Sequence, residues 1–272
     1  MAAKTLILLV VITANALGAF EKRSQGSPAM MLGGPTMASS EDPWATFMNP
    51  AVLQLNNERL LAISYAPQPF GLKELSRASV MVVEPASFGH LSFSASKFGF
   101  ELYREITFSL SYGATVSNAF HLGVSLNHYG LTIKNYGSAS TIGIDLGGVV
   151  EVSDDVRWGF AATNVNFPKL GESEEPLPQV FATGVAYAPF DVGVIALDIV
   201  KDVRHSPEVV VGLEYVVVQS VRLRAGVCTE PSVLNAGLGL SFDFVRLDYA
   251  FSSTADLGFT HQASLIFFLT KF

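Results

Sequence analysis

The sequence predicts an all-β chain that forms a transmembrane antiparallel β-barrel of about 14 strands, with an N-terminal segment folded into the lumen as a hatch. Three observations predict this fold. The chain begins with a hydrophobic leader, it continues with many short runs in which apolar residues alternate with Gly, Ser, Asn and charged residues, and it ends on an aromatic residue, Phe272. A closed barrel pairs every backbone N–H and C=O within lipid. We therefore expect the protein in the bacterial outer membrane.

The first element, residues 1–19, has the features of a secretory signal peptide. Lys4 precedes an apolar stretch that ends in small residues, and Ala14 and Ala16 fit an A-x-A cleavage site. We expect cleavage between Ala16 and Phe20, which removes the leader from the mature protein. The alternative, a membrane anchor, is disfavoured because the apolar run is shorter than the roughly 20 residues of a spanning helix.

Residues 20–51 form the second element, the hatch. This segment is rich in Gly, Pro, Ser and Met and shows no alternation, yet Trp44 and Phe47 make it too apolar for a solvated tail. Pro50 fixes its own φ and biases Asn49 toward an extended conformation. The Asn49 side chain can then bond nearby backbone and turn the chain toward the first strand. The alternative is a disordered periplasmic tail.

Residues 52–272 form the barrel, in which the period of the pattern is two from about Glu58 onward. FHLGVSLNH, TIGIDLGGVVEV, VRLRAGVC, VLNAGLGLSF and FVRLDYAF alternate clearly, and turn-rich segments such as APQPFG, TEPS and SSTAD separate such runs. Strands with one apolar face need an apolar solvent on that side. A soluble β-sandwich or lipocalin-like barrel would also alternate, but aromatic residues at strand ends favour membrane interfaces.

The same alternation identifies side chains that face the lumen. It predicts inward charges at Glu208, Glu214, Arg222, Arg224, Arg246 and Asp248. They could form a charged constriction that selects solutes. Alternatively, they could form ion pairs that stabilise the barrel and anchor the hatch. The mixture of positive and negative charges favours this second interpretation. Leu223→Arg should be costly on the lipid face, whereas Gly226→Ser should be mild unless the hatch packs there.

Composition and motifs exclude several function classes. Hydrophobic residues make up 49% of the chain, and the net charge of −7 includes no basic patch for nucleic acid. The five histidines show no metal-ligand spacing, and no Ser–His pair stands out as a catalytic triad. The single cysteine, Cys228, cannot form an internal disulfide. We predict no enzyme activity, no metal and no cofactor.

An ordered set of motifs carries a family resemblance. GSPAMMLGG and ASSEDPWATFMNPAV are followed in order by WGFAATNV, EPLPQVFATGVAY, VVVGLEY, RLRAGV and RLDYAFSSTADLGFTHQASLIF. The set resembles PorV/PorQ-type outer-membrane proteins, relatives of the long-chain fatty acid transporters, over nearly the whole mature chain. The matching N-terminal positions are Met31, Gly33, Gly34, Glu41, Asp42, Asn49, Pro50 and Ala51. Pro35 and Val52 depart from the family's small residues, and the chain is shorter than typical members.

The resemblance implies three alternative functions. The first is a binding component in protein export or surface assembly, as in type IX secretion, with exported proteins as partners. The second is a fatty-acid-transporter-like channel for hydrophobic small molecules, and the third is a structural barrel without a through-path. In each case the partners include outer-membrane lipid and the barrel insertion machinery, which the resemblance implies reads Phe272 as an insertion signal.

Overall fold

The computed structural model describes residues 18–21, 25–34, 36–39, 42–172, 174–190 and 192–271. The helical turns are α1 (Ser27–Met31), η1 (Pro43–Phe47), η2 (Pro50–Leu55), η3 (Pro69–Gly71) and η4 (Lys73–Leu75). The barrel strands are β1 (Glu58–Ala66), β2 (Arg77–Ala86), β3 (Gly89–Gly99), β4 (Tyr103–Ser117), β5 (Phe120–Ile133), β6 (Gly137–Glu151), β7 (Val156–Ala162), β10 (Val180–Phe190), β11 (Gly193–Asp202), β12 (Glu208–Val218), β13 (Val221–Thr229), β14 (Ser232–Phe242), β15 (Val245–Thr254) and β16 (Gly258–Lys271). A small hairpin joins β8 (Lys169–Leu170) to β9 (Glu175–Pro176).

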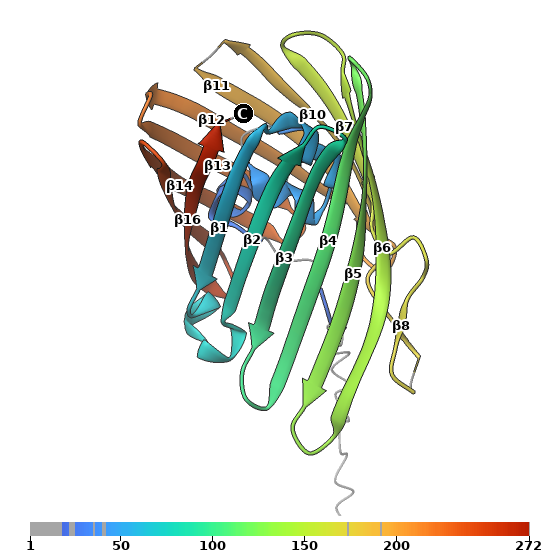
Figure 1. Ribbon diagram of the computed structural model, residues 1–272. Helices are drawn as coiled ribbons and strands as arrows, with labels where there is room; N and C mark the ends of the chain where they lie inside the picture. The colour runs from blue at the N-terminus through green and yellow to red at the C-terminus, as the bar shows by residue number, and fades with distance from the viewer. Residues whose placement is uncertain are drawn as a thin grey trace, which may run out of the picture.

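The described residues form a closed antiparallel barrel of 14 strands, which confirms the predicted fold class and strand number (Figure 1). Strands that follow one another in the chain also lie side by side, and β16 closes the ring by pairing with β1. In that closing ladder Ser64 lies opposite Ser264. Closure joins the first and the last strand, so neither of them forms an open edge of the sheet in the membrane.

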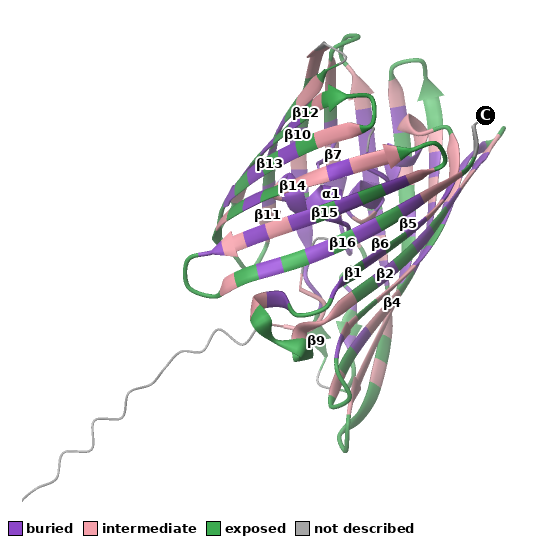
Figure 2. Ribbon diagram, turned by 90° about the vertical axis from the view of Figure 1, so that its left-hand side faces the viewer, coloured by how far each residue is buried: buried purple, intermediate pink, exposed green. Residues whose placement is uncertain are grey.

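The two faces of each strand differ as the alternation predicts. On β5, Ser125 and Asn127 are buried, while Leu122 and Leu126 are 42% and 49% exposed. Figure 2 shows the same banding of buried and exposed residues along the strands. The exposed face is apolar, so the surrounding solvent must be hydrocarbon, and the protein is located in the bacterial outer membrane.

Among the described residues, no helix is long and apolar enough to cross a membrane.

The two ends of the barrel can be told apart by their connections. At the end where β1 begins and β16 finishes, tight turns such as 219–220 and 243–244 join the strands. The opposite end, at the bottom of Figure 1, carries the longer connections 67–76 and 163–179. Because outer-membrane barrels have short periplasmic turns and longer extracellular loops, we assign this opposite end to the cell exterior.

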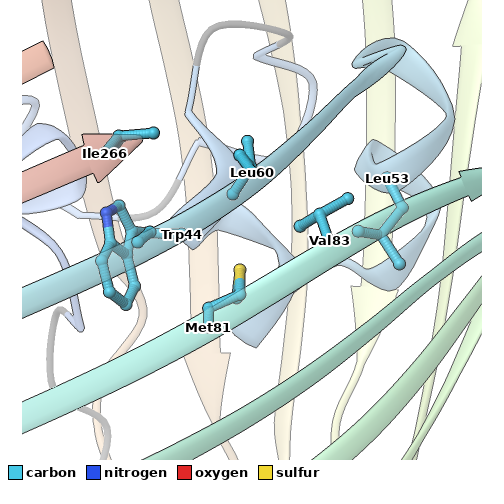
Figure 3. Packing of buried hydrophobic residues seen from close by; sticks show 7 residues of the cluster. Trp44, Leu53, Leu60, Met81, Val83 and Ile266 are labelled. Carbon is cyan, nitrogen blue, oxygen red and sulfur yellow. The ribbon is translucent and has the colours of Figure 1, made fainter. Parts of the chain in front are cut away.

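The described parts of residues 25–55 lie inside the ring of strands (Figure 1). Trp44 of η1 and Leu53 of η2 join an apolar cluster with Leu60, Met81, Val83 and Ile266 of the neighbouring wall (Figure 3). Trp44 is 1% exposed, so its indole loses nearly all contact with solvent. Burial of a side chain of this size contributes strongly to holding a segment in place.

Some predicted features lie outside the described residues. These are residues 1–17 of the leader, Pro35, Glu41 and Phe272. The cleavage site, the domain boundaries and the insertion signal therefore stay predictions.

Candidate functional site

Small residues on the inner wall let the N-terminal segment approach the strands very closely. A Cβ atom added to Gly147 of β6 would lie 2.0 Å from Oδ1 of Asn49, and one added to Gly226 of β13 would lie 2.2 Å from the carbonyl carbon of Leu32. Real Cβ atoms do not come so close to other atoms, so only glycine fits at either position. The N-terminal segment therefore packs against Gly226, and replacement of this glycine should not be mild.

The corner at Asn49 has the conformation that its sequence predicts. Asn49 is extended, with φ −127°, and its Oδ1 accepts a hydrogen bond of 3.1 Å from the backbone N–H of Ala51. Its amide group donates to the carbonyl oxygens of Met37, at 2.6 Å, and Gly148 of β6, at 3.2 Å. One side chain therefore ties two parts of the segment to the barrel wall. Asn49 is fully buried, so each of these bonds would be costly to lose.

Met31, Gly33 and Gly34 lie where α1 meets the wall. Met31 is fully buried, and Gly34 is close to Val210 of β12. Gly33 has φ +87°, in the left-handed region that glycine adopts without strain, directly after the end of α1. This glycine reverses the chain after α1 while it lies close to Val210 and Val227 of the wall.

Five of the six predicted lumen charges form one network, in which all but Arg222 are buried. Glu214 pairs with Arg224, whose Nη1 lies 2.7 Å from Oδ1 of Asp248. Arg246 Nε lies 3.0 Å from the other oxygen of Asp248, and Arg222 Nε lies 3.8 Å from Glu214. The two signs alternate across β12, β13 and β15, an arrangement that suits internal ion pairing better than the selection of passing solutes.

The sixth predicted charge, Glu208, lies apart from this network at the extracellular end of β12. Its carboxylate lies 3.7 Å from the thiol of Cys228 on β13. Cys228 is buried, and its thiol also lies 3.7 Å from the carbonyl oxygen of Glu230.

Asp42 links the N-terminal segment to the network. Its side chain caps η1 by accepting a 3.0 Å bond from the N–H of Trp44, and only 2% of the residue is exposed. Burial raises the pKa of Asp42 to about 6, and the positive charges of Arg246 and Arg224 oppose this rise. The carboxyl group therefore lies within the field of the lumen arginines.

The extracellular half of the lumen contains a cavity of about 130 Å³. Its lining combines polar and charged side chains with five aromatic residues: Phe20, Trp44, Phe47, Phe98 and Tyr129. Phe20 and Tyr129 pack edge to face with ring centroids 4.9 Å apart. A cavity of roughly 150 Å³ in another protein holds one benzene ring, so this space suits a small aromatic molecule.

Asp145 of β6 lies at the floor of this cavity, although it is not among the predicted site residues. Its Oδ2 accepts 2.6 Å from Asn127, and its Oδ1 accepts 2.8 Å from the backbone N–H of Asn164. Asp145, Asn127 and Phe47 also line a smaller cavity directly beneath. Alternation marked Asp145 as inward, but no local motif marks a carboxylate that will face a cavity.

The barrel wall is interrupted beside this cavity. β7 ends at Ala162, so the β6–β7 ladder covers only Leu146–Glu151 of β6. Beyond it, Val165 N–H donates 2.9 Å to the carbonyl of Ile144. The amide side chain of Asn166 completes the edge with 2.8 Å bonds to Ile144 N–H and the carbonyl of Ile142. Side-chain bonds thus replace a strand ladder over this stretch.

On the periplasmic side of the interruption, the outer face of the barrel contains an apolar groove. Two adjacent cross-strand rows line it, one with Leu122, Phe160 and Ile199, and the other with Leu146 and Phe181. Thr163, Asn164 and Val180 line the lumen cavity, whereas the neighbouring Ala161, Ala162 and Ala182 line the groove. The cavity and the groove therefore lie on opposite sides of the wall near the end of β7.

A second cluster lies at the extracellular rim. Glu21, Asp202 and His205 bring possible metal-ligand atoms within 4.8 Å of one another, although no spacing in the sequence indicates this. Arg204 lies 3.2 Å from Glu21 and 3.5 Å from Asp202 and so already supplies a positive charge. We assign no metal to this cluster.

Solved structures provide the comparison for this barrel. The monoaromatic hydrocarbon channel CymD aligns with a TM-score of 0.68 at 13% identity, over 90% of this chain and 98% of that chain. The toluene transporter TbuX of Ralstonia pickettii aligns with a TM-score of 0.63 at 13% identity, over 89% of this chain and 96% of that chain. A FadL homologue of Pseudomonas aeruginosa aligns with a TM-score of 0.64 at 14% identity, over 91% of this chain and 98% of that chain. This chain has the FadL-type barrel fold.

At these identities the likeness shows the fold alone. The fold agrees with the one that the motif resemblance implied, and the likeness does not show the PorV/PorQ type. No protein-family model and no curated protein sequence matches the chain.

Proposed function

We propose that this FadL-type barrel admits small, largely apolar molecules from the cell exterior into the lumen cavity and releases them sideways through the barrel wall. The observation that carries the proposal is that the lumen cavity and the outer groove lie on opposite sides of the wall near the early end of β7. The channel and transporter names of the similar structures support it.

The N-terminal segment acts in this proposal as a hatch that closes the direct path to the periplasm. Leu32 and Asn49 press against wall glycines, and Trp44 is held in an apolar cluster. Many buried contacts would have to break together before this segment could leave the lumen. A sideways exit avoids that cost.

The interruption beside β7 is the part of the wall that can open most easily. Its closure depends on Val165 and Asn166 rather than on a continuous ladder. An apolar molecule that passes between β6 and β10 enters the groove beside Ala162 and Phe181. From the groove it can diffuse into the hydrocarbon layer without crossing water.

A reversible disulfide across the interruption tests this route. In a Cys228→Ala background, Ile144→Cys and Val165→Cys join two backbones that already share a hydrogen bond. Uptake of radiolabelled toluene is measured in cells that lack their own apolar-solute channels. We expect uptake to fall several-fold on oxidation and to recover on reduction, so the reduced protein is the matched control. Unchanged uptake after oxidation would refute the sideways exit, and uptake no faster than in cells without the barrel would refute the channel.

Export of other proteins, which the motif resemblance implies, stays the alternative proposal. It requires a stable complex between this barrel and exported chains at the extracellular end. Affinity purification of the barrel from its native membrane after chemical cross-linking tests it. Stoichiometric recovery of exported proteins would favour this role over the channel.

A further inference from the structure

The floor of the lumen cavity is rich in hydrogen-bond acceptors. Asp145 is 5% exposed, and both of its oxygens accept only from neutral groups, the Asn127 amide and the Asn164 backbone. Among the described residues no Lys, Arg or His side chain forms an ion pair with this carboxylate. A buried carboxylate without a counter-charge is costly, and a bound cation would reduce this cost.

Asn164 provides a second acceptor at the same place. Its Oδ1 is buried and has no hydrogen-bond partner within the described part of the chain. A Cβ atom on Gly143 would lie 2.1 Å from this oxygen and 2.7 Å from the Tyr129 ring, so the oxygen sits beside an aromatic wall of the cavity. Both acceptors call for N–H or O–H donors from a bound molecule.

The aromatic lining adds attraction of the same kind. The faces of Trp, Tyr and Phe rings carry negative potential and attract organic cations, most strongly where water is excluded. Trp44, Phe47 and Tyr129 all line the cavity. Phe47 also lines the smaller cavity beneath with Asp145, which places ring and carboxylate next to each other.

Positive side chains also reach the cavity, but at its mouth. Arg77 and Lys97 lie at the extracellular ends of β2 and β3, and Glu105 lies at the same level on β4. Asp145 shares its cross-strand row with Ser111, which lies about 20 Å farther along β4 than Glu105 at roughly 3.3 Å per residue. The mouth therefore carries both signs, and the floor carries acceptors.

We propose that the lumen cavity binds small organic amines in their ammonium form, with Asp145 as counter-charge, Asn164 as a second acceptor and aromatic rings as walls. This inference rests on the proposed channel function and names the ligand class of the same cavity. It separates this barrel from one that accepts only uncharged hydrocarbons.

The test compares three probes of matched shape on the full-length barrel in detergent. Benzylammonium, toluene and benzoate share one ring and differ in charge. The chain has two tryptophans, so Trp158→Phe leaves Trp44 in the cavity as the only indole fluorophore. We expect benzylammonium to bind about tenfold or more tightly than toluene, because its hydrogen bonds to Asp145 are charge-assisted. Benzoate should bind most weakly.

Asp145→Asn should remove this preference and leave the affinity for toluene unchanged. Asp155→Asn is the matched control, because Asp155 lies exposed in the β6–β7 turn, away from the cavity. Equal or tighter binding of toluene by the otherwise unchanged barrel would overturn the amine inference and leave the channel proposal intact. If none of the three probes binds, the cavity is not a ligand site and both proposals fail. This comparison needs no variant of Asp145, so it remains decisive if Asp145→Asn does not fold.

Discussion

The effect of a substitution in this barrel depends on what surrounds the side chain on its own face of the strand. Gly226 is a small residue in an ordinary strand, yet the backbone of Leu32 occupies the space where a side chain would be. Leu223, on the other face of β13, is 47% exposed on the apolar outer surface. Substitutions at the two positions are therefore destabilising for different reasons. At Gly226 a side chain overlaps the N-terminal segment, and at Leu223 a charge is transferred into hydrocarbon.

Gly226→Ser should destabilise the docked N-terminal segment, and Leu223→Arg should destabilise the barrel itself by about 2–4 kcal/mol if it lies near the midplane. Heat-modifiability on gels measures barrel folding, and protease protection of residues 25–55 measures docking. We expect Gly226→Ser to lose protection while the barrel stays folded. Ala225→Ser, on the outer face beside it, is the control. Full protection in Gly226→Ser would contradict the close packing.

At the scale of elements, the short helical turns act through their ends. Asp42 begins η1 and Asn49 begins η2, and each accepts a hydrogen bond from the backbone two residues later. Asp42 also faces the lumen arginines, so the capping residue of one turn is tied to the charge network of β13 and β15. Docking of η1 should therefore depend on pH.

The sign of this dependence follows from the raised pKa of Asp42, about 6 against an ordinary value of 3.8. The docked state holds its proton more tightly than the undocked state, so docking is most stable below pH 4 and weakens as pH rises through 6. A pKa difference of about two units changes the free energy of docking by roughly 3 kcal/mol at most.

Hydrogen exchange of the backbone amides in residues 42–48, measured from pH 4 to pH 8 and corrected for intrinsic exchange rates, tests this expectation. Protection should decline as pH rises, and Asp42→Asn should flatten the decline. A pH profile that Asp42→Asn does not change would show that another group controls docking.

The whole molecule combines a closed wall with an occupied lumen. Distant parts of the chain meet in that lumen, as where the Ser27 N–H donates 2.9 Å to the hydroxyl of Ser264 and where the Met37 N–H donates 3.0 Å to Asp198. The barrel ladders do not depend on these contacts, because each strand pairs with its neighbours in the ring. The wall should therefore fold without the segment.

Deletion of residues 27–48 should open the lumen and raise single-channel conductance several-fold in planar bilayers. The control is the intact barrel with the double substitution Ser27→Ala and Ser264→Ala, which loses local bonds but keeps the segment. A deletion variant that folds, as shown by heat-modifiability, and stays closed would remove the hatch role.

The sequence alone was sufficient for the barrel and for the facing of its strands. Alternation is a local property, since each residue on a strand faces opposite to its neighbour, and the polarity of lumen and lipid selects which face is apolar. For this reason the inward position of Arg224 and the outward position of Leu223 could be inferred without knowing which strands are adjacent. The corner at Asn49 was equally local, because Pro50 restricts the residue before it.

Only the tertiary structure decided what the inward residues meet. The pairing of Arg224 with Glu214 and Asp248 depends on the register of three strands, and the cavity around Asp145 depends on a segment roughly a hundred positions earlier in the chain. The early end of β7 is likewise invisible in the pattern, because Thr163 could continue the alternation. Alternation specifies which face a side chain is on, but closure and register determine its neighbours, and a site is made of neighbours.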